Sequence, residues 1–96
     1  MALALARFKL IFFVPESALN ACKTAIFSAG AGRYPDAEKY TECCWTALGM
    51  GQFRPGPGSN PSIGKVGTLE IVREARVEVL CFGEDIVKKA VEALKR

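Results

Sequence analysis

The sequence predicts an α+β fold in which one antiparallel sheet carries two helices on the same face. Three observations support this prediction. The stretch 69–81 alternates apolar with charged residues, the pattern of a strand with one buried face. The stretch 7–14 is rich in aromatic and branched residues, and apolar residues at helical spacing follow it directly. A second pattern of helical spacing occupies the last residues, so the strands and helices together suit a single domain over 1–96.

The first strand and the first helix are expected to be adjacent along the chain. Apolar side chains lie on both faces of the strand at 7–14, a pattern that indicates an interior strand. Pro15 and Glu16 suit the first turn of the helix. The inward face of this helix is predicted to hold Leu19, Cys22, Ile26 and Ala29. Gly30 and Gly32 supply the left-handed conformation that often ends a helix.

A turn at Tyr34-Pro35-Asp36 is expected to lead into a second strand at 40–48, in which Cys43 and Cys44 point to opposite faces. Residues 49–67, rich in glycine and proline, are predicted to form a long structured loop, and residues 1–6 a disordered tail. The final helix is expected to begin after Gly83. Its inward residues are predicted to be Ile86, Val87, Ala90, Val91 and Leu94.

This order of elements, β-α-β-β-α, predicts a ferredoxin-like sandwich without its fourth strand. The usual four-stranded order would make the first and third strands central. Without a fourth strand, the first strand becomes an edge that exposes an apolar run, Leu10–Val14. We therefore expect a neighbouring subunit, or residues absent from this chain, to cover that edge.

The composition argues against several classes of function. The net charge is +3 and no basic run exceeds Lys88-Lys89, so no phosphate-binding footprint is indicated. Acidic residues on the predicted third strand, Glu70, Glu74 and Glu78, would repel RNA. The apolar runs are too short to span a membrane. These features together predict no nucleic-acid partner and no membrane partner. The four cysteines form no Cys-x-x-Cys pair, which favours a reduced, cytoplasmic protein.

The sequence contains no histidine, and this disfavours catalysis and zinc binding. Cys22 and Cys81 are expected in the core. A soft-metal site that uses Cys43 and Cys44 from adjacent subunits remains an alternative to the prediction of no metal and no cofactor. The loop fails as a phosphate cradle because no helix follows it. The planar guanidinium of Arg54 is suited to hydrogen bonding with a carboxylate or another anion. Phe53 and Ile63 would anchor the loop to the core of its own domain or to a neighbour.

Four ordered sequence words resemble one family. They are Ala29–Arg33, Gly51–Pro55, Asn60–Gly64 and Gly67–Glu70. The chain is similar to the inserted domain of the NGG-one-interacting-factor-three-like family, the GTP cyclohydrolase type 2 homologues, and to standalone versions of that domain. The resemblance implies a fold like that of the trimeric PII and CutA proteins. The metal-binding halves that flank this domain in relatives have no counterpart here, so the resemblance carries over no cyclohydrolase activity.

We therefore expect a non-enzymatic interaction or regulatory domain that forms a homo-oligomer, a dimer or a trimer, and presents the loop 49–67 to an unknown partner. The alternative is a module that binds a small molecule or metal ion between subunits. The candidate binding residues are Arg33, Gly51, Gln52, Phe53, Arg54 and Asn60.

Overall fold

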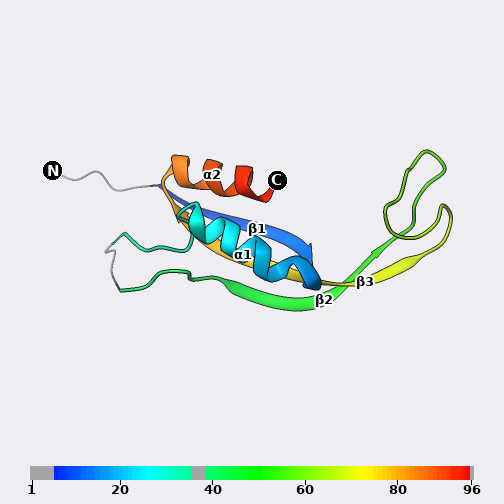
Figure 1. Ribbon diagram of the computed structural model, residues 1–96, viewed down its shortest axis with the longest axis horizontal. Coiled ribbons are helices and arrows are strands. Elements are labelled where there is room, and N and C mark those ends of the chain that lie inside the picture. The colour runs from blue at the N-terminus through cyan, green and yellow to red at the C-terminus, as the bar shows by residue number, and fades with distance from the viewer. Residues whose placement is uncertain (1–5, 36–38, 96) are drawn as a thin grey trace.

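The computed structural model describes residues 6–35 and 39–95 (Figure 1). The elements run β1 (Arg7–Pro15), a 3-10 turn η1 (Glu16–Ala18), α1 (Leu19–Ser28), β2 (Trp45–Phe53), β3 (Glu70–Phe82) and α2 (Glu84–Leu94). The predicted α+β class, with one three-stranded antiparallel sheet and two helices, is confirmed. Residues 1–5 of the expected tail, which was predicted over 1–6, and residue Asp36 of the expected turn lie outside the described residues. No helix in the described part of the chain is long and apolar enough to cross a membrane.

The strand order is β1-β3-β2, so β3 is central and pairs antiparallel with both neighbours. Alternation along β3 is as predicted, with Ala75, Val77, Val79 and Cys81 buried on one face. The prediction that β1 is an interior strand is wrong for this chain. β1 is an edge, and side chains on its outward face, Ile11 and Phe13, are exposed. The alternative, that β1 becomes an edge without a fourth strand, describes the structure.

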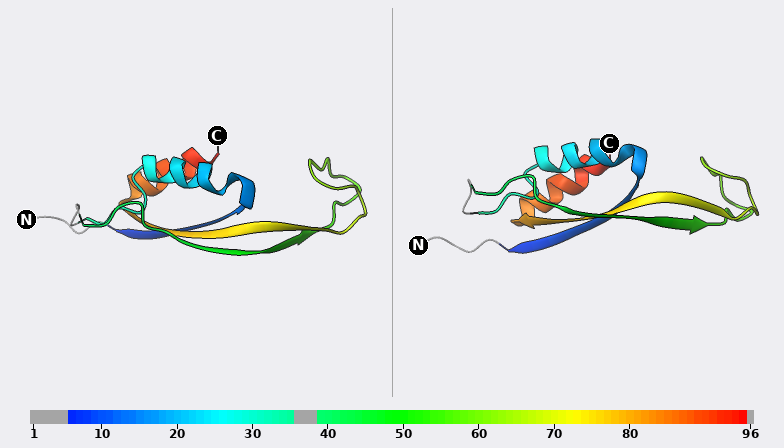
Figure 2. Two further views of the ribbon diagram at one scale, coloured as in Figure 1. Left: turned by 60° about the horizontal axis from the view of Figure 1, so that its bottom comes forward. Right: turned by 90° about the horizontal axis from the view of Figure 1, so that it is seen from below.

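Both helices pack on the same face of the sheet (Figure 2). The buried core between the helices and the sheet consists of Ile26, Ala31, Val79, Cys81 and Ala90, with Phe8, Leu10 and Phe12 of β1 packed against it. Val91, predicted to point inward, is instead partly exposed. Gly83, in a left-handed conformation, separates β3 from α2, and Glu84 and Asp85 place negative charge at the positive end of that helix.

The second strand begins and ends five residues later than predicted. The N–H of Gly32 donates to Leu80 O (2.8 Å), and the N–H of Cys43 donates to Gly32 O (3.0 Å). Gly32 therefore lies between β3 and Cys43, and β2 pairs with β3 only from Trp45 onward. Consequently Cys43 and Cys44 precede the strand, and Gly49 to Phe53, predicted as loop, are its second half.

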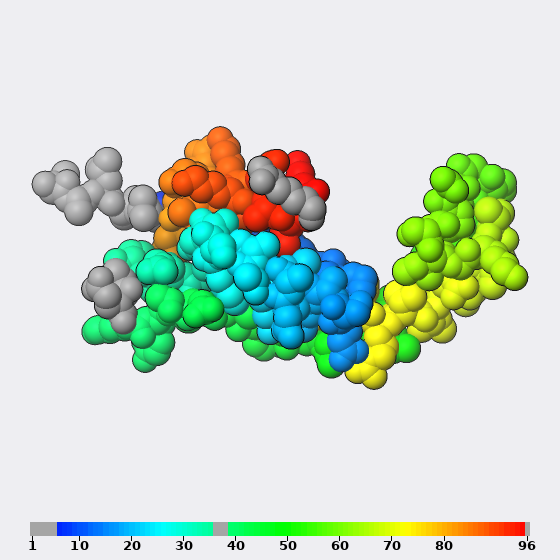
Figure 3. Space-filling model, viewed as in Figure 1, coloured from blue at the N-terminus to red at the C-terminus, as the bar shows by residue number. Residues whose placement is uncertain are grey.

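The molecule is elongated. Its radius of gyration is 16.4 Å, whereas a compact chain of this length would have about 12.5 Å. The elongation comes from the β2-β3 hairpin, which projects past the helices and ends in a loop (Figure 3). The pairing of β1 with β3 ends at Pro15, opposite Glu74, so β3 residues nearer the loop pair with β2 alone.

Candidate functional site: the hairpin arm and the open face of the sheet

The part of the hairpin beyond the end of β1, residues 50–73, is called here the hairpin arm. Met50 pairs with Arg73 at its base, and Phe53 pairs with Glu70 at the start of the loop. A two-stranded hairpin is marginally stable in water by itself. Only one ion pair in the described residues ties the base of the arm to the rest of the domain, between Arg73 Nε and Glu16 Oε2 at 2.9 Å. The arm therefore extends beyond the rest of the domain and makes few contacts with it.

The loop at the tip of the arm closes on itself. Arg54 Nη1 donates to Gly67 O (3.2 Å), and the N–H of Gly67 donates to Pro55 O (2.8 Å). Pro55 is buried beneath this closure. Gly67 has φ 81°, in the left-handed region that favours glycine. Arg54 is therefore a loop-closing residue in this structure, and its side chain remains exposed.

Two carboxylates of β3 pack against glycines of the arm. A Cβ atom built on Gly51 would lie 2.5 Å from Glu74 Oε1, and one built on Gly64 would lie 2.5 Å from the Cγ of Glu70. The glycines at these positions leave room for the two side chains. The family-like words at 51–55, 60–64 and 67–70 thus meet in one structural unit, in which Gly51 and Gly64 allow close packing and Gly67 supplies a left-handed backbone conformation.

Apolar side chains cover the arm without burying one another. Met50 is 67% exposed, and Phe53, Ile63, Val66, Leu69 and Ile71 are exposed as well. Phe53 and Ile63 do not anchor the loop to the core of this chain, because the loop lies beyond the helices (Figure 1). Exposed apolar residues that gather at one end of a small domain indicate an interaction surface.

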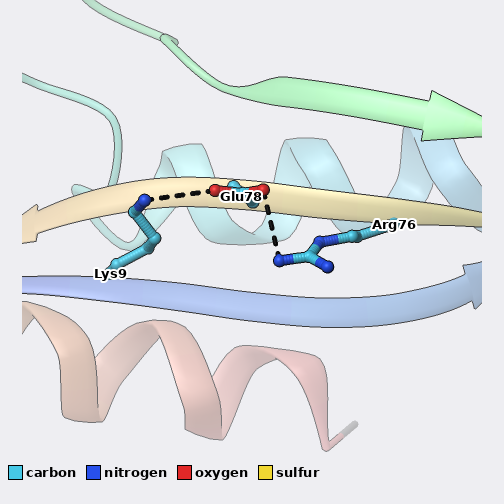
Figure 4. A network of polar contacts seen from close by, with 3 residues as sticks. All are labelled: Lys9, Arg76 and Glu78. Atoms are coloured by element: carbon cyan, nitrogen blue, oxygen red, sulfur yellow. Dashed lines mark ion pairs between the residues drawn. The ribbon is translucent and has the colours of Figure 1, made fainter.

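The sheet face opposite the helices, called here the open face, is also partly apolar. The cross-strand register places Ile11 and Trp45 on either side of Glu78, and Phe13 beside Arg76. Glu78 accepts two ion pairs, from Lys9 Nζ (3.3 Å) and Arg76 Nη2 (3.3 Å) (Figure 4). Lys9, Arg76 and Glu78 therefore form a small salt-bridged cluster on this part of the open face. Such partly exposed pairs each contribute about 0–1 kcal/mol to stability.

One hollow of about 290 Å³ opens on this face, where the chain enters β2. Its lining residues are Lys9, Tyr34, Cys43, Cys44, Trp45, Glu78, Val79 and Leu80. Cys43 and Cys44 are free and half-buried. The Cys43 thiol contacts Thr41 O (3.6 Å), and Cys44 Sγ lies 3.9 Å from the Thr46 hydroxyl. Among the described residues, no three His, Cys, Asp or Glu side chains are grouped to hold a metal ion.

The six candidate binding residues fall into two places. Gly51, Gln52 and Phe53 end β2, and Arg54 and Asn60 belong to the tip loop. Arg33 lies at the opposite end of β3, next to Gly32, and lines a separate shallow hollow with Phe27, Thr41 and Glu42. The structure does not bring Arg33 to the other five.

Sequence reasoning missed the apolar surface of the arm and the hollow. The signal for the first was present, since Leu48 and Met50 continue the alternation of β2 across Gly49 and Gly51. The hollow had no sequence signal, because it depends on Gly32 separating Cys43 from β3.

Comparisons with known proteins identify relatives that are longer than this chain. No protein-family model matches the sequence. A protein from Mycobacterium tuberculosis named GTP cyclohydrolase 1 type 2 homolog is 44% identical over 72 residues, which cover 75% of this chain and 18% of that protein. The Bacillus subtilis protein of the same name is 35% identical over 86 residues, 90% of this chain and 22% of that protein. This chain thus spans about a fifth of the length of these relatives.

A solved structure agrees with the sequence matches. The crystal structure of a Bacillus cereus protein described as related to NIF3 superposes with a TM-score of 0.76 at 28% identity, covering 97% of this chain and 22% of that one. The matched segment includes nearly all of the fold described above.

Proposed function

Because the chain is homologous to one segment of the GTP cyclohydrolase 1 type 2 homologues, of which it spans about a fifth, we propose that it is a non-enzymatic interaction domain. The domain self-associates through the edges of its sheet and presents the hairpin arm to its partner. Its fold is a three-stranded form of the ferredoxin-like sandwich, similar to PII and CutA proteins. We place it in the cytoplasm, since its four cysteines are free and their spacing indicates no disulfide framework.

The observation that carries this proposal is the surface of β2. Its nine residues, WTALGMGQF, include no charge and no proline, although the strand is an edge. Natural edge strands are commonly protected by charged residues, prolines, bulges or a covering element. Trp45, Leu48 and Met50 are all more than half exposed on this strand. An edge of this kind is stable in solution when a partner covers it.

A catalytic role has less support. The name of the relatives refers to proteins much longer than this chain, which matches only about a fifth of their length, and histidine is absent from this sequence. The buried thiol of Cys81 is a poor nucleophile, because burial raises its pKa and so disfavours the thiolate. On the open face, Lys9 and Arg76 are both paired with Glu78.

The second candidate function, a small-molecule or metal-ion module, rests on the hollow beside Cys43. Two free thiols, two aromatic rings and the Lys9–Glu78 pair line it, a set that suits a soft ion or a small planar ligand. Titration with cuprous and divalent ions, followed by thiol accessibility, tests it. Protection of Cys43 and Cys44 would support this candidate, and unchanged accessibility would count against it.

Sedimentation velocity at micromolar concentrations tests the interaction proposal. We expect an oligomer that Met50→Lys dissociates, because the substitution places a charge on the exposed edge of β2. Asn20→Lys, on the exposed surface of α1, is the matched control and should leave the oligomer intact. A wild-type chain that remains a monomer at about 50 µM would overturn the proposal.

A further inference from the structure

Cys43 and Cys44 are adjacent along the chain and line the same hollow beside the start of β2. Both thiols are free and half-buried. We infer that this pair is a modification site, at which a low-molecular-weight disulfide of the glutathione class oxidises the two thiols to a reversible disulfide between adjacent residues. This site goes beyond the proposed interaction function and does not depend on it.

The position of the pair outside the sheet allows a bond between neighbouring residues. Successive side chains of a strand point to opposite faces, so adjacent cysteines within a strand cannot meet. In this chain β2 pairs with β3 only from Trp45 onward, and the N–H of Cys43 donates to Gly32 O (3.0 Å). Glu42, with φ 56°, turns the chain just before the pair. The two cysteines are therefore free of the alternation that a β ladder imposes.

The thiols of the reduced chain make only weak polar contacts. Cys43 Sγ lies 3.6 Å from Thr41 O, and Cys44 Sγ lies 3.9 Å from the Thr46 hydroxyl. A thiol is a weak hydrogen-bond donor and acceptor, so these contacts do little to oppose rotation of the side chains. The contact of Cys43 is exposed, whereas Cys44 also packs against the buried core. Cys43 is therefore the thiol that a reagent in solution reaches first.

The oxidation proceeds by two exchange steps. The thiolate of Cys43 attacks one sulfur of the small disulfide, whose S–S bond breaks, and one small thiolate leaves and takes up the proton that Cys43 released. The thiolate of Cys44 then attacks the Cys43 sulfur of the mixed disulfide. The bond between Cys43 and Cys44 forms, and the second small thiolate leaves and takes up the proton of Cys44. The protein loses two electrons and two protons, which convert the small disulfide into two thiols.

The spacing of adjacent residues makes this disulfide easy to reduce. Consecutive Cα atoms are about 3.8 Å apart across a trans peptide bond, whereas the Cα atoms of disulfide-bonded cysteines are usually about 4.4–6.8 Å apart. A disulfide between neighbours is therefore strained, and strained disulfides are the labile ones that small thiols readily reduce. Transient disulfides of this kind suit the cytoplasm proposed above, where thiols are otherwise kept reduced.

Peptide mapping of the whole chain tests the site. After incubation with glutathione disulfide, the chain should have lost two of its four free thiols. The missing mass of two hydrogen atoms should lie in the peptide that contains Cys43 and Cys44, while Cys22 and Cys81 remain open to alkylation once the chain is unfolded. Excess reduced glutathione should restore all four thiols. Four alkylated cysteines after oxidation, or a disulfide that includes Cys22 or Cys81, would overturn the inference.

Two variants test the order of the steps. Cys44→Ser should retain one glutathione on Cys43, because no neighbouring thiol displaces it. Cys22→Ser removes a half-buried thiol outside the hollow and is the matched control, which should close as the wild type does. Trp45, the only tryptophan, directly follows the pair, so quenching of its fluorescence by the neighbouring disulfide should follow closure in the wild type and the control. An intramolecular disulfide in Cys44→Ser, or an adduct on Cys22 in place of Cys43, would overturn the inference.

Discussion

Replacing Gly32 by alanine should destabilise the domain more than replacing Gly49, Gly51 or Gly64 by alanine. Gly32 has φ 73°, and its added Cβ would lie 2.5 Å from Cys43 O and 2.9 Å from Cys43 N. The left-handed conformation costs a non-glycine residue about 1 kcal/mol or more. Relief of the contact requires the backbone of Cys43 to move, which breaks its hydrogen bond to Gly32 O and costs about 1 kcal/mol more. The expected loss is about 2–3 kcal/mol.

Urea unfolding at one fixed protein concentration measures this loss of unfolding free energy. In thermal unfolding, the same loss should lower the melting temperature by about 10–20 °C. The matched control is Gly49→Ala in β2, where an added Cβ has no atom within 4 Å. We expect the control to stay within about 0.5 kcal/mol of wild type. Equal stability of the two variants would refute the conclusion that Gly32 separates β3 from the segment that leads into β2.

Three further predictions concern the tip loop and the core. Arg54→Ala should cost at most about 1 kcal/mol of unfolding free energy, because its hydrogen bond to Gly67 is exposed; a loss of about 2 kcal/mol or more would indicate a buried structural role. Ile26→Ala should cost about 2–5 kcal/mol by leaving a cavity in the fully buried core, and a loss under about 1 kcal/mol would contradict that position. The free energy of unfolding should fall as pH rises past about 9, because burial raises the pKa of Cys81 and the unfolded chain loses this proton first. Cys81→Ala should reduce this dependence, and an unchanged slope would assign it to other groups.

Much of the fold could be predicted from local patterns. The alternation along 69–81 located β3 to within one residue at each end, because one face of that strand is buried and the other is polar. The final helix was also predicted correctly, since Gly83 and the two acids that follow it mark its start. Whether β1 is interior or at an edge could not be decided from its apolar residues alone. That position depends on which strands are available to pair with it.

The error in β2 has a specific physical cause. Residues 40–44 have strand-like composition, but Gly32 occupies the place beside Leu80 that they would need in order to pair. Glu42, with φ 56°, turns the chain just before Cys43. Gly49 and Gly51 suggested a loop, although here they continue the strand, and Gly51 leaves space for Glu74. The contact between Gly32 and Cys43, which are eleven positions apart, decided the boundaries, and no local sequence pattern predicts it.

Two glycines of the stretch 49–67 have structural roles in this molecule, because Gly51 and Gly64 accommodate carboxylates of β3. The apolar side chains of the arm have no such role within one copy, because they contact little of their own domain. Because Gly51 and Gly64 serve the internal packing of the hairpin, substitutions there should disturb the arm without abolishing the sheet edges. Assembly and arm integrity would then be separable, since Gly64→Val should disturb the tip loop and leave β1 and β2 free to pair between copies. Loss of both properties in that variant would mean that the arm itself forms part of the contact between subunits.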